Sequence, residues 1–235
     1  MENNTQQFYS QAYDTPAESL GRYTSKTFGW MFAGLLVTFL VAYFGYTTQT
    51  IVYVFAIPYA YLVLAGVELA VVLYLSARIQ KMSVLTAKVL FFMYAILNGV
   101  VFSAYFLIYG MLDLILVFAA TSLFFGIMAV LGLVTNADFS RIRPFMTAGL
   151  IFLIAFWALS MFINLSQFET IVCTIGIFIF LVFTAYDTQK IRAYHAYYAS
   201  NPEMAAKASI FSALQLYLDF INLFLYLIRI LGRKK

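Results

Sequence analysis

The chain has 235 residues, of which 64% are hydrophobic and 10% are charged, with a net charge of +4. This composition excludes a soluble globular domain, and the long apolar runs predict helices that cross a bilayer. One cysteine and one histidine exclude an internal disulfide and any metal site built from several cysteines or histidines. The basic residues lie mostly in short segments between apolar runs, so we expect no nucleic-acid partner.

The two ends of the chain are polar. Residues 1–26 carry no signal-peptide pattern and precede the first apolar run, so we expect a polar N-terminal tail at the surface. Residues 233–235 form a short basic tail. Between them, residues 27–232 are predicted to form one all-α transmembrane domain of a multi-pass cell-membrane protein.

Seven helices are predicted within this domain. Pro58 either kinks the second helix or lies in its first turn. Ser200, Asn201 and Pro202 break the chain between the last two helices. The predicted helices cover residues 27–46, 51–77, 84–109, 112–134, 145–163, 170–198 and 209–231.

The basic residues predict the orientation of the chain. They precede the first helix and lie in alternate connections, whereas the other three connections contain no lysine or arginine. The positive-inside rule therefore places the N-terminus and the basic connections in the cytoplasm. Seven crossings then place the basic C-terminal tail outside. Either the internal basic residues outweigh this tail, or the last helix does not cross fully, and we favour the full crossing.

The last predicted helix, residues 209–231, carries an acidic residue near its centre. Asp219 at that depth costs about 2.5–3.5 kcal/mol on insertion scales. Other polar residues recur at spacings of three and four on the same face, which we expect to meet helices or water rather than lipid. The members of this stripe are Ser212, Gln215, Asp219, Asn222, Tyr226 and Arg229. Four of them are candidates to line a pore: Ser212, Gln215, Asn222 and Tyr226.

A second intramembrane carboxylate, Asp187, lies in the preceding predicted helix. Asp187 lies 14 residues before Asn201 and Asp219 lies 18 residues after it, so an antiparallel hairpin places both at a similar depth. Two carboxylates in a poor dielectric cannot easily both ionise, and they would titrate as a pair that senses protons. With nearby oxygens of Asn and Tyr, Asp187 and Asp219 could also attract calcium. The alternatives are a hydrated, structural Asp187 and an Asp219 that locks the bundle by a hydrogen bond.

Other polar residues have structural interpretations. We expect an ion pair for Glu68, with Arg229 as one possible partner. Arg78 is either an interfacial anchor or a latch that reaches the aspartates from the end of the second helix. Three further side chains are expected to make hydrogen bonds between helices. They are Asn98, Thr174 and Thr184.

Two segments resemble the Bax inhibitor-1 family, also called the transmembrane Bax inhibitor motif family, in its bacterial form. They are AYDTQKI at 185–191 and LYLDFINLFLYLIRILG at 216–232. The resemblance covers residues 27–232 in helix count and spacing. It implies seven helices with the last one central and wrapped by the other six, and a pH-sensitive calcium leak without a cofactor.

The same resemblance assigns roles to particular residues. The paired aspartates of the family match Asp187 and Asp219, which implies that their protonation gates the leak. Its helix-two acid matches Glu68, and its last-helix arginine matches Arg229. Arg78 is nearest to its latch arginine, one residue out of register.

Two other classes of function compete with a leak of calcium ions across the lipid bilayer that is controlled by protons. The protein could be a non-conducting modulator of a membrane protein partner, such as a membrane-bound protease, with the N-terminal tail as the docking element. An enzyme is not expected. The single histidine, His195, is expected to be solvated in a cytoplasmic segment, so no histidine base lies within the membrane for an intramembrane serine protease. Neither aspartate lies in the GxGD-type context of an aspartyl intramembrane protease.

Overall fold

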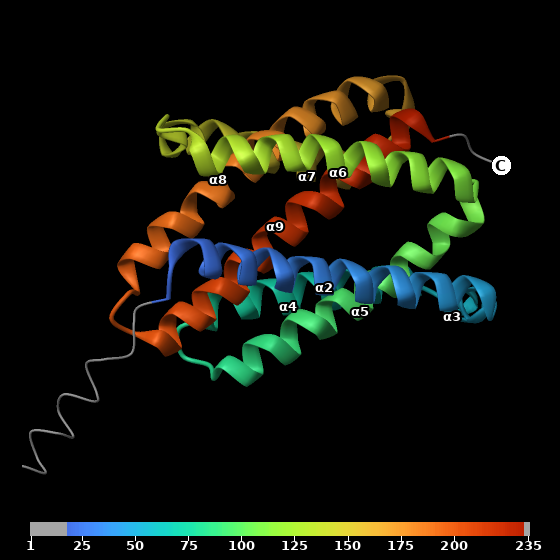
Figure 1. Cartoon of the computed structure of the whole chain (residues 1–235). Coiled ribbons are helices and arrows are strands. Elements are labelled where there is room, and N and C mark those ends of the chain that lie inside the picture. Colours follow the sequence, from blue (N-terminus) through green and yellow to red (C-terminus); the bar gives the residue numbers. More distant parts are fainter. Residues whose placement is uncertain (1–17, 233–235) are drawn as a thin grey trace, which may run out of the picture.

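The computed structural model describes residues 18–232, which contain helices and no strands, and thus confirms the all-α prediction. Figure 1 shows the helices packed as one bundle. Two short 3-10 helices, η1 (Phe139–Ile142) and η2 (Ser166–Phe168), lead into α7 and α8. The α-helices are α2 (Leu20–Thr47), α3 (Thr50–Ala56), α4 (Ala60–Arg78), α5 (Val84–Ile108), α6 (Met111–Val134), α7 (Arg143–Ser160), α8 (Glu169–Tyr197) and α9 (Pro202–Leu231).

Six helical segments of the described chain are long and apolar enough to cross a membrane. They are α2, α5, α6, η1 with α7, η2 with α8, and α9. The helix α4 is not among them, although its 19 residues would extend about 28 Å against a hydrocarbon core of about 30 Å. The described residues therefore support six spans, against the seven that the sequence predicts.

The predicted second helix is in fact two helices, α3 and α4. Ile57 is extended, with φ −71° and ψ 124°, because a residue before proline is disfavoured in the α conformation. Tyr59, on the other side of Pro58, has a left-handed backbone with φ 62°. Pro58 therefore separates two helices, which corrects the expectation that it kinks one helix or opens it.

Two helices begin earlier than their apolar runs do. The Ser19 side chain caps α2 by accepting a hydrogen bond from the backbone N–H of Arg22 at 3.4 Å. The Asn201 side chain caps α9 by accepting one from the backbone N–H of Met204 at 3.0 Å. Residues 20–26 of the predicted tail consequently belong to α2. The rest of that tail up to residue 17, and the basic tail at 233–235, lie outside the described residues.

The last helix, α9, is the most buried of the six candidate spans. Of its membrane-spanning window 72% is buried, against 11–39% in the other five. It packs extensively against α2, α5, α6 and α8, whereas α4 packs mainly on α5 and α7 on α8. Figure 1 shows α9 crossing diagonally behind α2. The interior of the bundle is therefore organised around α9.

Hydroxyl groups connect α9 to its neighbours. Thr27 and Ser209 share a hydrogen bond of 2.9 Å, and Thr38 and the Tyr217 hydroxyl share one of 2.6 Å. Thr38 also donates to the carbonyl of Ala95 in α5 at 2.9 Å. The three side chains predicted to bond between helices instead donate to carbonyls one turn earlier in their own helices. These are Asn98, Thr174 and Thr184.

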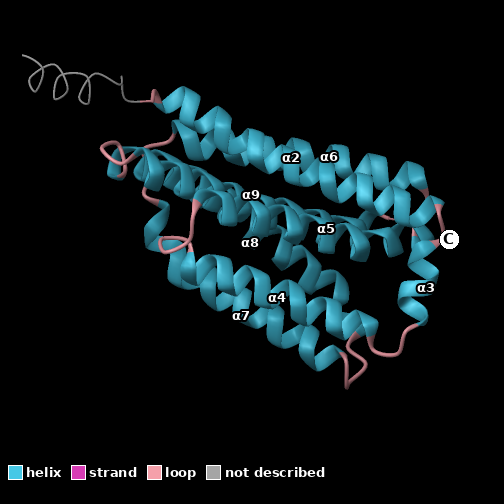
Figure 2. Ribbon diagram, turned by 90° about the horizontal axis from the view of Figure 1, so that it is seen from below, coloured by secondary structure: helices cyan, strands magenta, loops and turns pink. Residues whose placement is uncertain are grey.

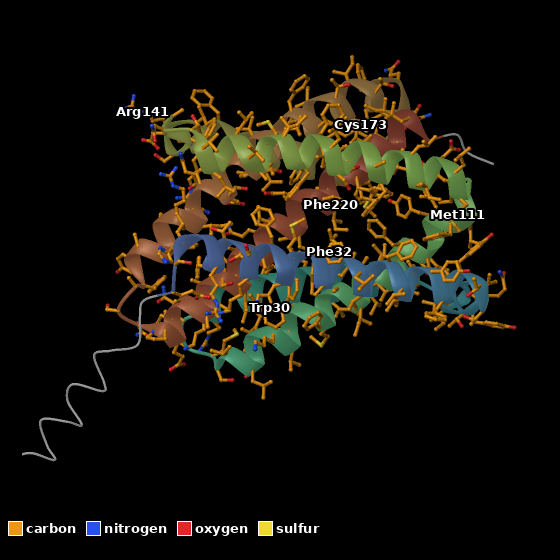
Figure 3. All side chains as sticks on the ribbon, in the orientation of Figure 1. Trp30, Phe32, Met111, Arg141, Cys173 and Phe220 are labelled. Atoms are coloured by element: carbon orange, nitrogen blue, oxygen red, sulfur yellow. The ribbon has the colours of Figure 1, made fainter. Side chains whose placement is uncertain are left out.

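The two described ends of the chain lie at opposite ends of the bundle (Figures 1 and 2). In Figure 3, Arg141 is at the end where α2 begins, and Met111 is near the other. The helix α9 thus runs the length of the bundle, as a full crossing by the last helix requires.

Candidate functional site

The two aspartates lie on neighbouring helices in the interior of the bundle. Asp187 of α8 is 5% exposed and Asp219 of α9 is 4% exposed. The two helices form an antiparallel hairpin with an extensive contact, and the carboxylates are close enough to interact electrostatically. The structure therefore brings together the pair that the sequence predicted at a similar depth.

Asp187 has a counter-ion that the sequence did not single out. The Lys190 ammonium lies 3.0 Å from Asp187 Oδ1, one helical turn further along α8, and 4.6 Å from the centre of the Tyr186 ring. Lys190 also interacts electrostatically with Asp219, and Arg143 does so with Asp187. An i, i+3 spacing of opposite charges was the available signal in the sequence.

Asp219 has a different environment. Its Oδ2 atom is buried and makes no hydrogen bond to the described residues, and the same is true of Ser212 Oγ and Gln215 Oε1. A buried polar atom without a partner costs about 1–3 kcal/mol. Three such oxygens on one face of α9 form a polar track suited to water or a cation.

The remaining residues of the α9 stripe have partners. The Asn222 amide donates to the carbonyl of Leu218 at 2.8 Å, and the Trp157 indole donates to the Tyr226 hydroxyl at 3.3 Å. Arg229 pairs with Glu169 at 3.2 Å and lies 4.1 Å from the centre of the Trp157 ring. The polar groups in the second half of the stripe therefore have hydrogen-bond or ion-pair partners, whereas oxygens of Ser212, Gln215 and Asp219 have none in the described chain.

The segment of α8 around Asp187 makes hydrogen bonds to α6 and to the segment that follows α6. Gln189 donates to the carbonyl of Ala137 at 2.7 Å and accepts from the N–H of Phe139 at 3.3 Å. Arg192 donates to the carbonyl of Leu133 at 2.9 Å. These contacts hold α8 against α6 beside the carboxylate pair, and spacing in the sequence gave no signal for them.

The three other charged residues of the site prediction have no contact with the aspartates in the described chain. Glu68 Oε1 is buried without a hydrogen-bond partner in the described chain, and Arg229 pairs with Glu169 rather than with Glu68. Arg78 is exposed at the end of α4, with no side-chain hydrogen bond or ion pair to the described residues. In this structure the cation beside the pair is therefore Lys190.

The acidic donors at the site are two carboxylates. Among residues 18–232, no group of three or more His, Cys, Asp or Glu side chains could hold a metal ion. Stable calcium sites use six to eight oxygens, which is more than two carboxylates provide.

Comparison with known proteins settles the family. A family model described as "Inhibitor of apoptosis-promoting Bax1" (Bax1-I) matches residues 20–235. The chain belongs to the Bax inhibitor-1 family. It is 33% identical to the inner membrane protein YbhL of Escherichia coli K12, an alignment that covers 94% of this chain and 95% of YbhL.

Two further relatives span nearly the whole chain. An uncharacterized protein of Deinococcus radiodurans is 37% identical, covering 88% of this chain and 89% of its own. An uncharacterized protein of Borreliella burgdorferi is 32% identical, and the alignment covers 91% of this chain and 93% of the relative. With the six apolar helices, these matches identify the chain as a membrane protein of this family.

Proposed function

We propose that this protein is a pH-sensitive calcium leak channel gated by protonation of Asp187 and Asp219. One observation carries the proposal: two buried carboxylates interact across the α8–α9 contact, and only one of them has a bonded counter-ion. Family membership supports it, because the resemblance implies a leak of this kind.

The charges of the site suggest how it would respond to pH. Two ionised carboxylates and one Lys190 ammonium leave one negative charge without compensation in a poor dielectric. Either a proton or a calcium ion removes that charge, so the two compete for the same oxygens. Protonation removes the repulsion between the two carboxylates and so favours contact between α8 and α9. Loss of the proton restores the repulsion and favours separation of the helices and entry of a cation.

The polar track on α9 would continue the path away from the aspartates. Ser212 and Gln215 provide oxygens without partners in the described protein, at one-turn intervals from Asp219. A cation that entered from the end of the bundle where α9 begins would meet Ser212 and Gln215 before Asp219. The pore-lining role proposed from the sequence therefore fits Ser212 and Gln215 better than Asn222 and Tyr226, which have partners.

In the proposed topology, α3 and α4 together form the seventh crossing, and all six other helices surround α9 in the membrane. The N-terminus and the basic connections face the cytoplasm, and the C-terminus faces outward. Burial of α9 and the opposite positions of the two described ends support this arrangement.

The test is calcium entry into liposomes that contain the purified protein and a trapped calcium dye, across mildly acidic to mildly basic pH. We expect a pH-dependent flux whose slope flattens in Asp187→Asn, Asp219→Asn and the double variant. Asp113→Asn, at the start of α6 and far along the bundle, is the matched control and should keep the slope. An unchanged slope in all the aspartate variants would contradict gating by the pair.

A folded protein that gives no flux above empty liposomes at any pH would contradict the channel itself. The modulator function would then become the leading proposal. Deletion of residues 1–17, which leaves α2 intact from Leu20, should in that case abolish capture of a membrane protein partner.

A further inference from the structure

An apolar groove of about 390 Å³ opens on the side of the bundle between α2 and α6. Its outer rim is exposed and includes Phe32 and Leu36 of α2 and Ile115 of α6, which are 46–65% exposed. Its floor is formed by α9 residues that are no more than 6% exposed, including Phe220 and Ile221. Figure 3 shows Phe220 between α2 and α6. The central helix α9 is therefore accessible from the side through this groove.

The lining of the groove is almost entirely aromatic and aliphatic. The Thr38 hydroxyl, its polar member on α2, is already engaged by Tyr217 and by the carbonyl of Ala95. An ion or a polar ligand would find no partner there. The occupant must therefore be apolar.

The position of the groove indicates which apolar group would occupy it. Both flanking helices are membrane spans, so the groove faces hydrocarbon. Acyl chains of the bilayer surround both helices, so they are the apolar groups that are already present at the groove. An acyl chain is thin enough to enter, and it restores the dispersion contacts that the walls of an empty groove lose.

We propose that the groove binds one acyl chain of a phospholipid, which lies directly against α9. Met111, at the start of α6, lines the groove, and Figure 3 shows it at the end of the bundle away from Arg141. The lipid therefore comes from the leaflet on the Met111 side. The chain contacts Phe220 and Ile221, the residues next to Asp219, so the site is independent of the calcium leak but adjacent to its proposed gate.

The experiment uses vesicles of phospholipid with a photoactivatable diazirine in the acyl tail. After illumination, labelled residues are mapped by peptide mass spectrometry. We expect label on Phe220, Ile221 or Phe224, which lipid can reach only through the groove. Leu216 and Leu223, which are fully buried in the same helix, should remain unlabelled. Label confined to the rim of α2 and α6 would overturn the proposal. So would loss of the α9 label as the protein-to-lipid ratio rises, which is the result expected if a second copy of the chain covers the groove.

Two adjacent residues of α6 provide a matched pair of variants. Ile115 lines the groove and is 56% exposed, whereas Leu116 does not line it and is 57% exposed. Ile115→Trp should fill the groove and remove the α9 label, while Leu116→Trp should keep it. If Ile115→Trp does not fold, Leu36→Trp fills the groove from the α2 rim. Equal α9 labelling in groove-filling and control variants would also overturn the proposal.

Discussion

Asp187 and Asp219 differ in what each loses on neutralisation. Asp187→Asn removes the partner of Lys190 and leaves that ammonium without a bonded carboxylate, whereas Asp219 has no bonded partner in the described chain to lose. We therefore expect Asp187→Asn to destabilise the protein, and Asp219→Asn to leave its stability unchanged or raised at neutral pH. Thermal unfolding in detergent measures the difference. Equal destabilisation by both variants would show that Asp219 has a structural partner.

Lys190 provides a second prediction at the residue level. Its bond to a buried carboxylate predicts a loss of about 1.5–3 kcal/mol of unfolding free energy in Lys190→Gln, the range for hydrogen bonds to charged groups. The loss should be largest at basic pH, where Asp187 is ionised, and should fade in acid, because a protonated carboxyl needs no counter-ion.

The control for Lys190 is Lys88→Gln, which removes a lysine that lies over the Trp30 ring, 4.8 Å from its centre, and pairs with no aspartate among residues 18–232. The double variant Asp187→Asn with Lys190→Gln should recover most of the stability lost by either single change. A pH-independent loss in Lys190→Gln would contradict the ion-pair explanation.

At the scale of elements, contact between α6 and α8 depends on a glycine beside the site. A Cβ at Gly132 would overlap the carbonyl oxygen of Ala185, two residues before Asp187, whereas one at Gly126 of the same helix would meet nothing within 4 Å. We expect Gly132→Ala to cost about 1–3 kcal/mol, as overpacking does, and to change the pH dependence of flux by displacing α8.

Gly126→Ala is the matched control for this contact. It should be neutral or raise stability by about 0.5–1 kcal/mol, because alanine is favoured over glycine within a helix. Equal thermal midpoints for the two variants would show that α6 and α8 do not pack as closely as the structure has them.

At the scale of the whole molecule, the proposed topology predicts the side of each connection. Ala137 and Gln167 are exposed in the connections that follow α6 and α7, which lie at opposite ends of the bundle; Gln167 belongs to η2. Cysteines placed there should react with a membrane-impermeant maleimide from different sides: Gln167→Cys from outside intact cells, and Ala137→Cys only after the membrane is opened.

The native protein supplies the background for that experiment. Its single cysteine, Cys173, is buried, so the unmodified chain should label weakly. Labelling of Ala137→Cys from outside would reverse the orientation that the basic connections predict.

Sequence alone determined the class of protein, the helices with long apolar runs and the two aspartates. These follow from local signals: bilayer length, the turn residues at Asn201 and Pro202, and the cost of an acid within an apolar run. It could not determine where α2 begins, because the Ser19 cap continues the helix into polar residues, or that α3 ends at Ala56, two residues before Pro58.

Only the tertiary structure decided which groups meet. Asp187 and Asp219 come close enough to interact electrostatically because α8 and α9 pack as a hairpin. Arg229 pairs with Glu169 instead of Glu68 because the end of α9 lies against the start of α8. The i, i+3 spacing in the sequence is enough to pair Lys190 with Asp187. Whether Arg78 also reaches the carboxylates depends on where α4 ends in the folded protein. The groove between α2 and α6 combines residues from four helices. The distance between α2 and α6 cannot be predicted from the sequence pattern of either helix alone.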